Sequence, residues 1–159
     1  MRSFSAFLLT ATTLALVHPA LAQSAPTVTD KAFSVTVTDA DGNSQSNFTD
    51  VVPLVEGACF QWQLQLGKAK LPVDVTETFT LPSAPATWGT SRDDITISAD
   101  RKTATSPLTI TPVDGWIWHG WCIAEGDPAG AHRFEITANG TQIGVFDFTV
   151  EPPRRTKQK

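Results

Sequence analysis

Apolar and polar residues alternate along much of the chain, with the period of two that a half-buried β-strand requires. The clearest alternation follows Gly57, where four large apolar residues share one face: Phe60, Trp62, Leu64 and Leu66. The residues between them form the opposite face: Cys59, Gln61, Gln63 and Gln65. Exposing the apolar groups would cost far more free energy than exposing the glutamines, so the apolar side must face a core. Cys59 therefore lies on the outer side of this strand.

The same reasoning predicts about eight short strands, separated by residues that set turn dihedrals. Their ranges are 31–38, 57–66, 73–81, 94–98, 103–111, 116–124, 132–138 and 141–150. Asn139-Gly140 is the strongest hairpin signal, because a type I′ turn needs positive φ at both central residues. Ile143 and Val145 fall out of phase with the residues that follow, so we expect a β-bulge near Gly144. Since no segment keeps a helical period, the pattern predicts an all-β fold, a single antiparallel β-sandwich.

The tryptophan-rich strand at 116–124 has two interpretations. Glycine inside a strand often marks a bulge, and large aromatic residues usually serve a core. On those grounds we expect a bulge at Gly120 that buries Trp116 and Trp118. In the alternative, the strand is unbroken, both rings lie on the outer face, and His119 points to the opposite side. The candidate binding residues are then a pair of flat rings flanked by two amides: Trp116, Trp118, Gln61 and Gln63.

The first 22 residues have the features of a secretory signal peptide and are not expected to belong to the fold. Arg2 supplies a positive charge, and the apolar run 6–17 is too short to span a bilayer. The small-x-small pattern at 20–22 predicts cleavage before Gln23. We therefore expect an exported protein, either periplasmic or extracellular.

Cys59 and Cys122 are the only two cysteines. An isolated pair in an oxidising compartment is expected to form a disulfide, which stabilises a domain by about 4 kcal/mol for a loop of this length. A metal-binding or redox pair would need close spacing such as C-x-x-C, which is absent. If Cys59 lies on an outer face, its partner must do so as well.

Charge is distributed unevenly along the chain, whose formal net charge is −4. Residues 23–151 are predicted to form the folded domain and carry most of the acidic groups. The tail, 152–159, contains four basic residues and no apolar one, which predicts a disordered segment. An acidic body argues against nucleic acid as a partner, because nucleic acid requires a basic footprint.

A set of short patterns lies in the last third of the chain and at the first cysteine. They are GDPAG at 126–130, FEI at 134–136, NG at 139–140, FDFTV at 146–150 and GACF at 57–60. This combination resembles secreted bacterial immunoglobulin-like modules, many of which are domains of unknown function. The resemblance implies an immunoglobulin-like sandwich and a non-catalytic role, and it supplies no ligand residues. Antibody-type domains differ, since they place a tyrosine two residues before the second cysteine, and this chain contains no tyrosine.

Few residues suggest catalysis, and we expect neither an enzyme nor a cofactor. His132 is in phase with Phe134, which favours a structural role, and no nucleophile, zinc-protease or phosphate-loop motif is present. Glu77 falls on the apolar face of its strand. A buried carboxylate is costly without a partner, so Glu77 is either paired or near a sheet edge, and we interpret it as an edge residue.

Residues 39–50 are predicted to be a polar loop and offer a weak metal candidate. Four oxygen-bearing side chains have spacing similar to a calcium loop: Asp39, Asp41, Asn43 and Asp50. Gly42 stands two positions earlier than such a loop requires, so we expect no tight site. Two acceptor patterns for N-glycosylation begin at Asn47 and Asn139, and they matter only in a host that glycosylates.

Three functional hypotheses remain, ranked by how much the sequence supports them. The first is a module that binds a protein or an envelope component through a sheet face. The second is a carbohydrate-binding module that uses tryptophan rings, and the third is a hydrolase. A cleft in which histidine and carboxylate converge would favour the third.

Overall fold

The computed structural model describes residues 24–90 and 92–153. The predicted signal peptide and most of the predicted basic tail therefore lie outside the described residues. Within them, ten strands and no helix are present. No helix in this part of the chain is long and apolar enough to cross a membrane.

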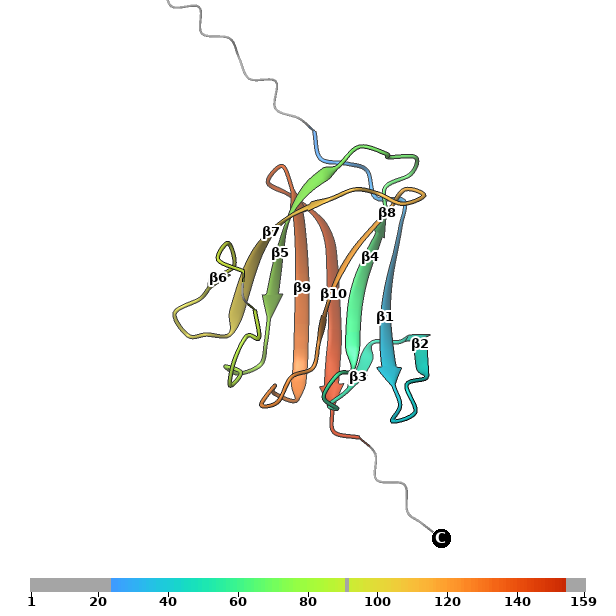
Figure 1. Cartoon of the computed structure of the whole chain (residues 1–159). Helices are drawn as coiled ribbons and strands as arrows, with labels where there is room; N and C mark the ends of the chain where they lie inside the picture. Colours follow the sequence, from blue (N-terminus) through green and yellow to red (C-terminus); the bar gives the residue numbers. More distant parts are fainter. Residues whose placement is uncertain (1–23, 91, 154–159) are drawn as a thin grey trace, which may run out of the picture.

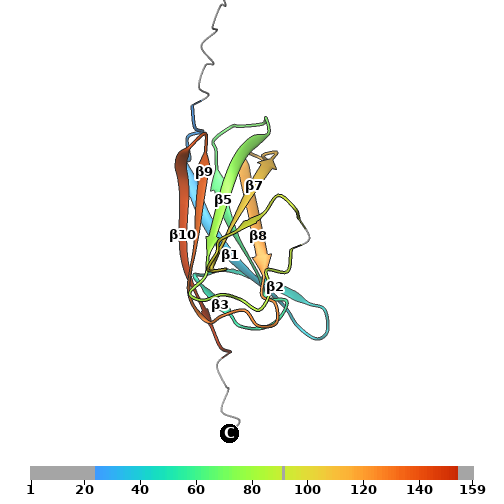
Figure 2. The ribbon, with the colours of Figure 1, turned by 90° about the vertical axis from the view of Figure 1, so that its left-hand side faces the viewer.

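The strands form two sheets packed face to face (Figures 1 and 2). The four-stranded sheet has the order β2-β1-β4-β8, with β1 at Asp30–Thr38, β2 at Ser44–Phe48, β4 at Cys59–Gln65 and β8 at Trp116–Cys122. The six-stranded sheet has the order β3-β10-β9-β5-β7-β6. Its strands are β3 at Val51–Pro53, β5 at Val73–Thr80, β6 at Thr96–Ile97, β7 at Thr103–Ile110, β9 at Gly130–Ala138 and β10 at Thr141–Glu151. The prediction of an all-β sandwich is confirmed, with β3 pairing parallel to β10 and the other pairs antiparallel.

One predicted loop contains a strand. The segment 39–50 was expected to be a loop throughout, but β2 pairs with β1 inside it, and the hydroxyls of Thr36 and Ser46 lie 2.7 Å apart. All residues of β2 are exposed. Because this edge strand buries neither face, it has no apolar alternation from which a strand can be predicted.

The hairpin between β9 and β10 follows the prediction. Asn139 and Gly140 have φ values of 50° and 73°, as a type I′ turn needs. The register of β10 against β9 shifts between Gln142 and Gly144, which confirms the expected bulge. The bulge turns Phe146 and Phe148 toward the core, where both are buried.

The core lies between the sheets and is rich in aromatic rings. The apolar side of β4 faces it as predicted, since Phe60, Trp62 and Leu64 are buried while the residues between them are half-buried. From the opposite sheet, Phe79 of β5 stacks on Phe134 of β9 with ring centroids 4.3 Å apart.

β8 is the last strand of the four-stranded sheet and therefore lies at an edge. β8 pairs only with β4, whereas β5 in the facing sheet has β9 on one side and β7 on the other. Trp88, from the loop after β5, packs against Phe79 and Trp121 beside this edge. The edge of β8 and the loop after β5 therefore meet.

Candidate functional site

The register of β4 and β8 decides between the two interpretations of the tryptophan strand. The glutamines of β4 lie opposite alternate residues of β8: Gln61 opposite Gly120, Gln63 opposite Trp118 and Gln65 opposite Trp116. The pairing continues without a shift along both strands, so no bulge exists at Gly120. The expectation that a bulge buries both rings is wrong, because Trp118 is 42% exposed and Trp116 is half-buried on the outer side.

The glycine at position 120 has a different structural reason. A Cβ atom there would lie 2.4 Å from the carbonyl oxygen of Phe60 and 2.7 Å from the Cβ of Gln61. Both distances are too short for real side chains, so the close approach of β8 to β4 requires glycine. Gly120 therefore marks a constraint on the backbone, as expected, but the constraint is the close approach of two strands and not a bulge.

The disulfide between Cys59 and Cys122 is formed, as predicted. The two residues lie directly opposite each other on β4 and β8, with Cα atoms 3.9 Å apart. Cys59 is half-buried and Cys122 is exposed, so the bond lies on the outer side of the four-stranded sheet. Among the described strands, it links the edge strand β8 to β4, its one neighbour in that sheet.

All four candidate binding residues thus share one surface. We call it the glutamine–tryptophan face, and its defining residues are Gln61, Gln63, Trp116 and Trp118. Directly paired residues of a sheet share a side, so Ser34 and Phe48 extend this face through the pairing of Gln61 with Ser34 and of Ser34 with Phe48. The Gln63 amide donates to the Ser34 hydroxyl at 3.0 Å, which orients it along the surface.

Sequence reasoning missed Phe48, which is 78% exposed on β2. In the sequence, Phe48 is a single aromatic residue after four polar ones. Because this segment was not predicted to be a strand, Phe48 could not be assigned to the face. A hollow of about 380 Å³ lies over Gly120, beside Trp118 and the disulfide. The face therefore presents an aromatic ring at each edge, with polar groups and a depression between them.

Glu77 is a buried carboxylate of the six-stranded sheet. It lies on β5, which has neighbours on both sides, and it is 0% exposed, so the interpretation as an edge residue is wrong. Its Oε2 accepts hydrogen bonds from Trp62 Nε1 at 2.5 Å and His119 Nδ1 at 2.8 Å, and its Oε1 accepts one from Trp121 Nε1 at 2.7 Å. The buried carboxylate is therefore paired by three donors, as a charge taken out of water requires.

This cluster connects the two sheets through polar groups. Glu77 comes from the six-stranded sheet, whereas Trp62 lies on β4 and both Trp121 and His119 lie on β8 of the other sheet. Hydrogen bonds to a carboxylate are roughly twice as strong as neutral ones. Because β8 is an edge strand, these bonds hold it over β5 and fix which side of the strand faces outward.

His119 points to the inner side, as the unbroken-strand alternative predicted. Its Nδ1 donates to the carboxylate of Glu77, so Nε2 is left for other contacts, and the side chain is 30% exposed. A hollow of about 250 Å³ lies next to it, between β8 and the segment containing Thr90 and Arg92. Histidine and carboxylate thus converge beside a surface hollow.

His132 is 4% exposed and lies at the start of β9, and its ring is stacked on Phe148 with centroids 5.3 Å apart. Its Nδ1 donates to the carbonyl oxygen of Gly130 at 2.9 Å. Burial lowers the pKa of His132 from its ordinary value. These contacts support the structural role expected for this residue.

The weak calcium candidate forms a tight turn. Asp39 Oδ1 accepts the backbone amides of Asp41 and Asn43 at 3.0 and 2.8 Å. The side chain of Asn43 also donates to both oxygens of Asp39, which lowers the pKa of this carboxyl. Asp50 lies beyond β2 and outside this turn. The described residues contain no cluster of three histidine, cysteine or acidic side chains arranged to hold a metal ion.

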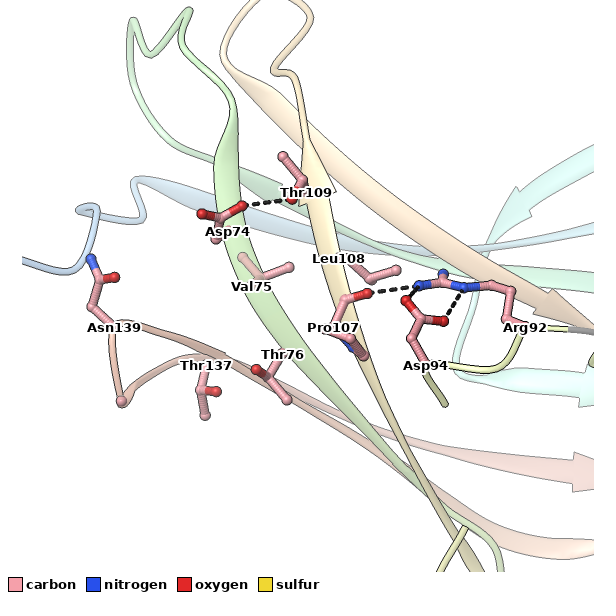
Figure 3. A pocket seen from close by; sticks show the side chains of 11 residues that line it. Asp74, Val75, Thr76, Arg92, Asp94, Pro107, Leu108, Thr109, Thr137 and Asn139 are labelled. Carbon is pink, nitrogen blue, oxygen red and sulfur yellow. Dashed lines mark hydrogen bonds and ion pairs between the residues drawn. The ribbon is translucent and has the colours of Figure 1, made fainter. Parts of the chain in front are cut away.

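A hollow of about 780 Å³ lies on the six-stranded sheet and is shown in Figure 3. Its charged groups are paired with each other, with the backbone or with a threonine hydroxyl. Arg92 donates to both oxygens of Asp94 and to the carbonyl oxygen of Pro107, and Thr109 donates to Asp74 at 2.6 Å. The pairing lowers the pKa of Asp94 and raises that of Arg92, so these groups are engaged in holding the loop to β7.

Comparison with known proteins gives a family and a fold. The model of the PM0630 beta sandwich domain family matches residues 31–151. The chain is also similar to an immunoglobulin-like protein from Pseudomonas aeruginosa, at 17% identity and a TM-score of 0.53, covering 82% of this chain and 99% of that one. The predicted resemblance to bacterial immunoglobulin-like sandwich modules is therefore confirmed for the fold.

A second solved structure is only distantly similar. It is the Pseudomonas fluorescens alkylpurine DNA glycosylase AlkC bound to DNA containing an abasic site analog, at 15% identity and a TM-score of 0.32, covering 64% of this chain and 27% of that one. A similarity at this level does not bear on fold or function. The search of curated proteins gave no match.

Proposed function

The chain belongs to the PM0630 beta sandwich domain family, and we propose that it is a non-catalytic binding module that recognises a protein or an envelope component through its glutamine–tryptophan face. The family name describes a fold and no ligand. The assignment of a role therefore depends on the surface chemistry of this chain.

The observation that carries the proposal is the outward position of Trp118 on the sheet face that also carries the amides of Gln61 and Gln63. Trp118 is 42% exposed, and Phe48 at the opposite edge of the same face is 78% exposed. Exposing large rings is unfavourable in a free domain, while tryptophan is enriched among the residues that dominate binding energy at protein interfaces. The amides of Gln61 and Gln63 lie between the rings and supply directional donors and acceptors.

Carbohydrate is the second candidate ligand, and a specific observation favours it. Trp118 lies directly opposite Gln63 and beside the hollow over Gly120. A flat ring next to an amide suits a sugar, whose CH face packs on the ring and whose hydroxyls bond to the amide. Trp116 lies two residues before Trp118 on the same side of β8 and would extend such a surface.

A hydrolase ranks third, although His119 and Glu77 converge. Both oxygens of Glu77 are occupied by three donors, so this carboxylate can orient His119 but cannot itself reach a substrate. Of the described residues lining the hollow beside His119, Thr90 alone carries a hydroxyl, and that hydroxyl accepts the backbone amide of Arg92 at 3.1 Å. This arrangement supports a structural use of the pair.

The proposed place of action is the periplasm or the cell exterior. The disulfide between Cys59 and Cys122 is consistent with an oxidising compartment. The predicted signal peptide, residues 1–22, would deliver the chain there.

The test compares ligands captured by three immobilised proteins: wild type, Trp118→Ala and Leu71→Ala. Leu71 is 80% exposed and lies outside the face, so its variant is a matched loss of exposed apolar area. Each protein is incubated with an envelope fraction of the host and with a glycan array. A ligand held by wild type and Leu71→Ala but lost by Trp118→Ala supports the proposal, and its identity as protein or glycan separates the first two candidates. If every retained ligand is indifferent to Trp118→Ala, the face is not the binding surface.

A further inference from the structure

A second, smaller hollow lies between the two sheets, away from the glutamine–tryptophan face. It measures about 210 Å³ and is lined by residues near the ends of β5 and β8 and the start of β9. These parts of the strands lie toward the lower end of the sandwich in Figure 1. Five of the twelve residues that line it carry aromatic rings: Phe60, Phe79, Trp88, Trp121 and His132. A cavity of about 150 Å³ is enough to hold benzene, so this one can accept a small ring with a short substituent.

The rings of Trp88, Trp121 and Phe79 line this hollow. Trp88 meets Trp121 at 72° and Phe79 at 79°, with centroids 5.9 Å away in both cases. Aromatic rings that line a hollow can contact a bound molecule through their faces. The faces carry negative partial charge, which attracts a cation or the hydrogens of a polar donor.

The hydrogen-bond donors of these walls are turned away from the hollow. The indole of Trp88 donates to the carbonyl oxygen of Arg101 at 3.1 Å, and that of Trp121 donates to Glu77. Both rings are therefore held in place by bonds to the surrounding protein. Because both indole N–H groups are already bonded, a bound molecule can contact these rings through their faces.

Two side chains that line the hollow, His132 and Asp127, offer acceptor atoms, while the hydroxyl of Thr87, which accepts the Gly89 amide at 3.1 Å, can also donate. His132 is 4% exposed, and its Nδ1 hydrogen is used by Gly130, so the atom that the imidazole can offer to a guest is Nε2 with its lone pair. The lowered pKa of this ring keeps it in the neutral form that has such a lone pair. Asp127 uses Oδ2 to accept the backbone amide of Ala124 at 2.8 Å, and no described residue donates to its other oxygen. Asp127 Oδ1 and His132 Nε2 thus accept no hydrogen bond from the described side chains.

We propose that this hollow is a binding site for a small amine with an apolar body, such as an arylalkylamine. The ammonium group would donate to Asp127 and to Nε2 of His132, and the apolar body would pack against Trp88, Phe79 and Trp121. This site is independent of the glutamine–tryptophan face, so either can exist without the other. An acid of the same size should bind less tightly, because its carboxylate would meet the like charge of Asp127.

The test uses calorimetric titration of the purified protein with three probes of one size: benzylamine, toluene and benzoate. Benzylamine should bind with one-to-one stoichiometry and at least tenfold more tightly than the other two, because only it can donate to the acceptors. Asp127→Asn keeps the bond to the Ala124 amide while removing the charge, and it should weaken benzylamine binding by about tenfold or more. Asp50→Asn, an equal change of charge at an exposed position outside the hollow, should leave binding unchanged.

A second measurement needs no variant. The Nε2 nitrogen resonance of His132 in the wild-type protein should shift on addition of benzylamine, because its lone pair accepts a new hydrogen bond. Equal binding of toluene and benzylamine, or benzylamine binding that leaves this resonance in place, would overturn the proposal.

Discussion

The substitution Glu77→Gln tests the cluster that holds β8 over the facing sheet. Glutamine has the same shape but offers one acceptor oxygen, whereas three donors converge on this position: Trp62, Trp121 and His119. The amide NH₂ would meet a donor in place of an acceptor. Trp62 is 0% exposed, so its N–H cannot turn to water if its partner is lost.

The expected size of the effect follows from these contacts. A hydrogen bond to a charged group contributes about 1.5–3 kcal/mol, and an unpaired buried donor costs about 1–3 kcal/mol. Since at least one donor loses its partner, we expect a decrease of about 2–4 kcal/mol in the free energy of unfolding. For a domain of this size that corresponds to a fall in Tm of roughly 10 °C.

Urea unfolding followed by tryptophan fluorescence measures this change, and near-ultraviolet circular dichroism verifies that the variant is folded. The matched control is Glu135→Gln on β9, where the side chain is 38% exposed and makes a loose ion pair with Arg133 at 3.6 Å. Its effect should stay within about 0.5 kcal/mol. If Glu77→Gln is as mild as this control, the cluster does not hold the sheets together and the reasoning fails.

Four further predictions follow from the described contacts. Reduction of the Cys59–Cys122 bond should lower the free energy of unfolding by about 4 kcal/mol, and alkylation of both thiols in native, unreduced protein would contradict the pairing. Acrylamide should quench a tryptophan component that Trp118→Phe removes, and an unchanged quenching curve would show that the ring is buried. Burial lowers the pKa of His132, so the unfolded chain takes up a proton more readily. The contribution of His132 to the free energy of unfolding should then be fully present above about pH 6.5 and decrease as the pH falls below that value. The decrease in stability should be less steep in His132→Gln. Calorimetry with calcium should detect no micromolar site, and stoichiometric binding abolished by Asp41→Ala would refute this.

Sequence reasoning predicted the longer strands that bury one side, but not the three-residue β3, in which the single buried Val52 gives no alternation. β4 shows a strict alternation of apolar and glutamine positions because one face meets the core and the other meets solvent. β2 was not predicted to be a strand, because both of its sides are exposed and it therefore has no apolar alternation. The bulge near Gly144 was visible because two apolar residues fall out of phase with their neighbours.

The candidate site was only partly predictable, because its chemistry depends on pairs far apart in the chain. Glu77 could not be matched with His119 from the sequence, since 42 residues separate them and the two lie in different sheets. Because His119 pairs with Glu77, its side chain points inward, and the side chain of the neighbouring Trp118 points outward. The alternation along β8 does not by itself decide between these two orientations. Gly120 was taken for a bulge because glycine has the same signature where two backbones approach closely.

The claim that the glutamine–tryptophan face is the binding surface can be tested by photo-crosslinking in the host. A photoreactive amino acid is introduced in place of Gln63, on this face, or in place of Thr78, a half-buried position of β5 on the outer side of the other sheet. We predict that irradiation links Gln63-substituted protein to a specific envelope ligand and leaves Thr78-substituted protein unlinked. Crosslinks that form from position 78 but not from position 63 would contradict the account.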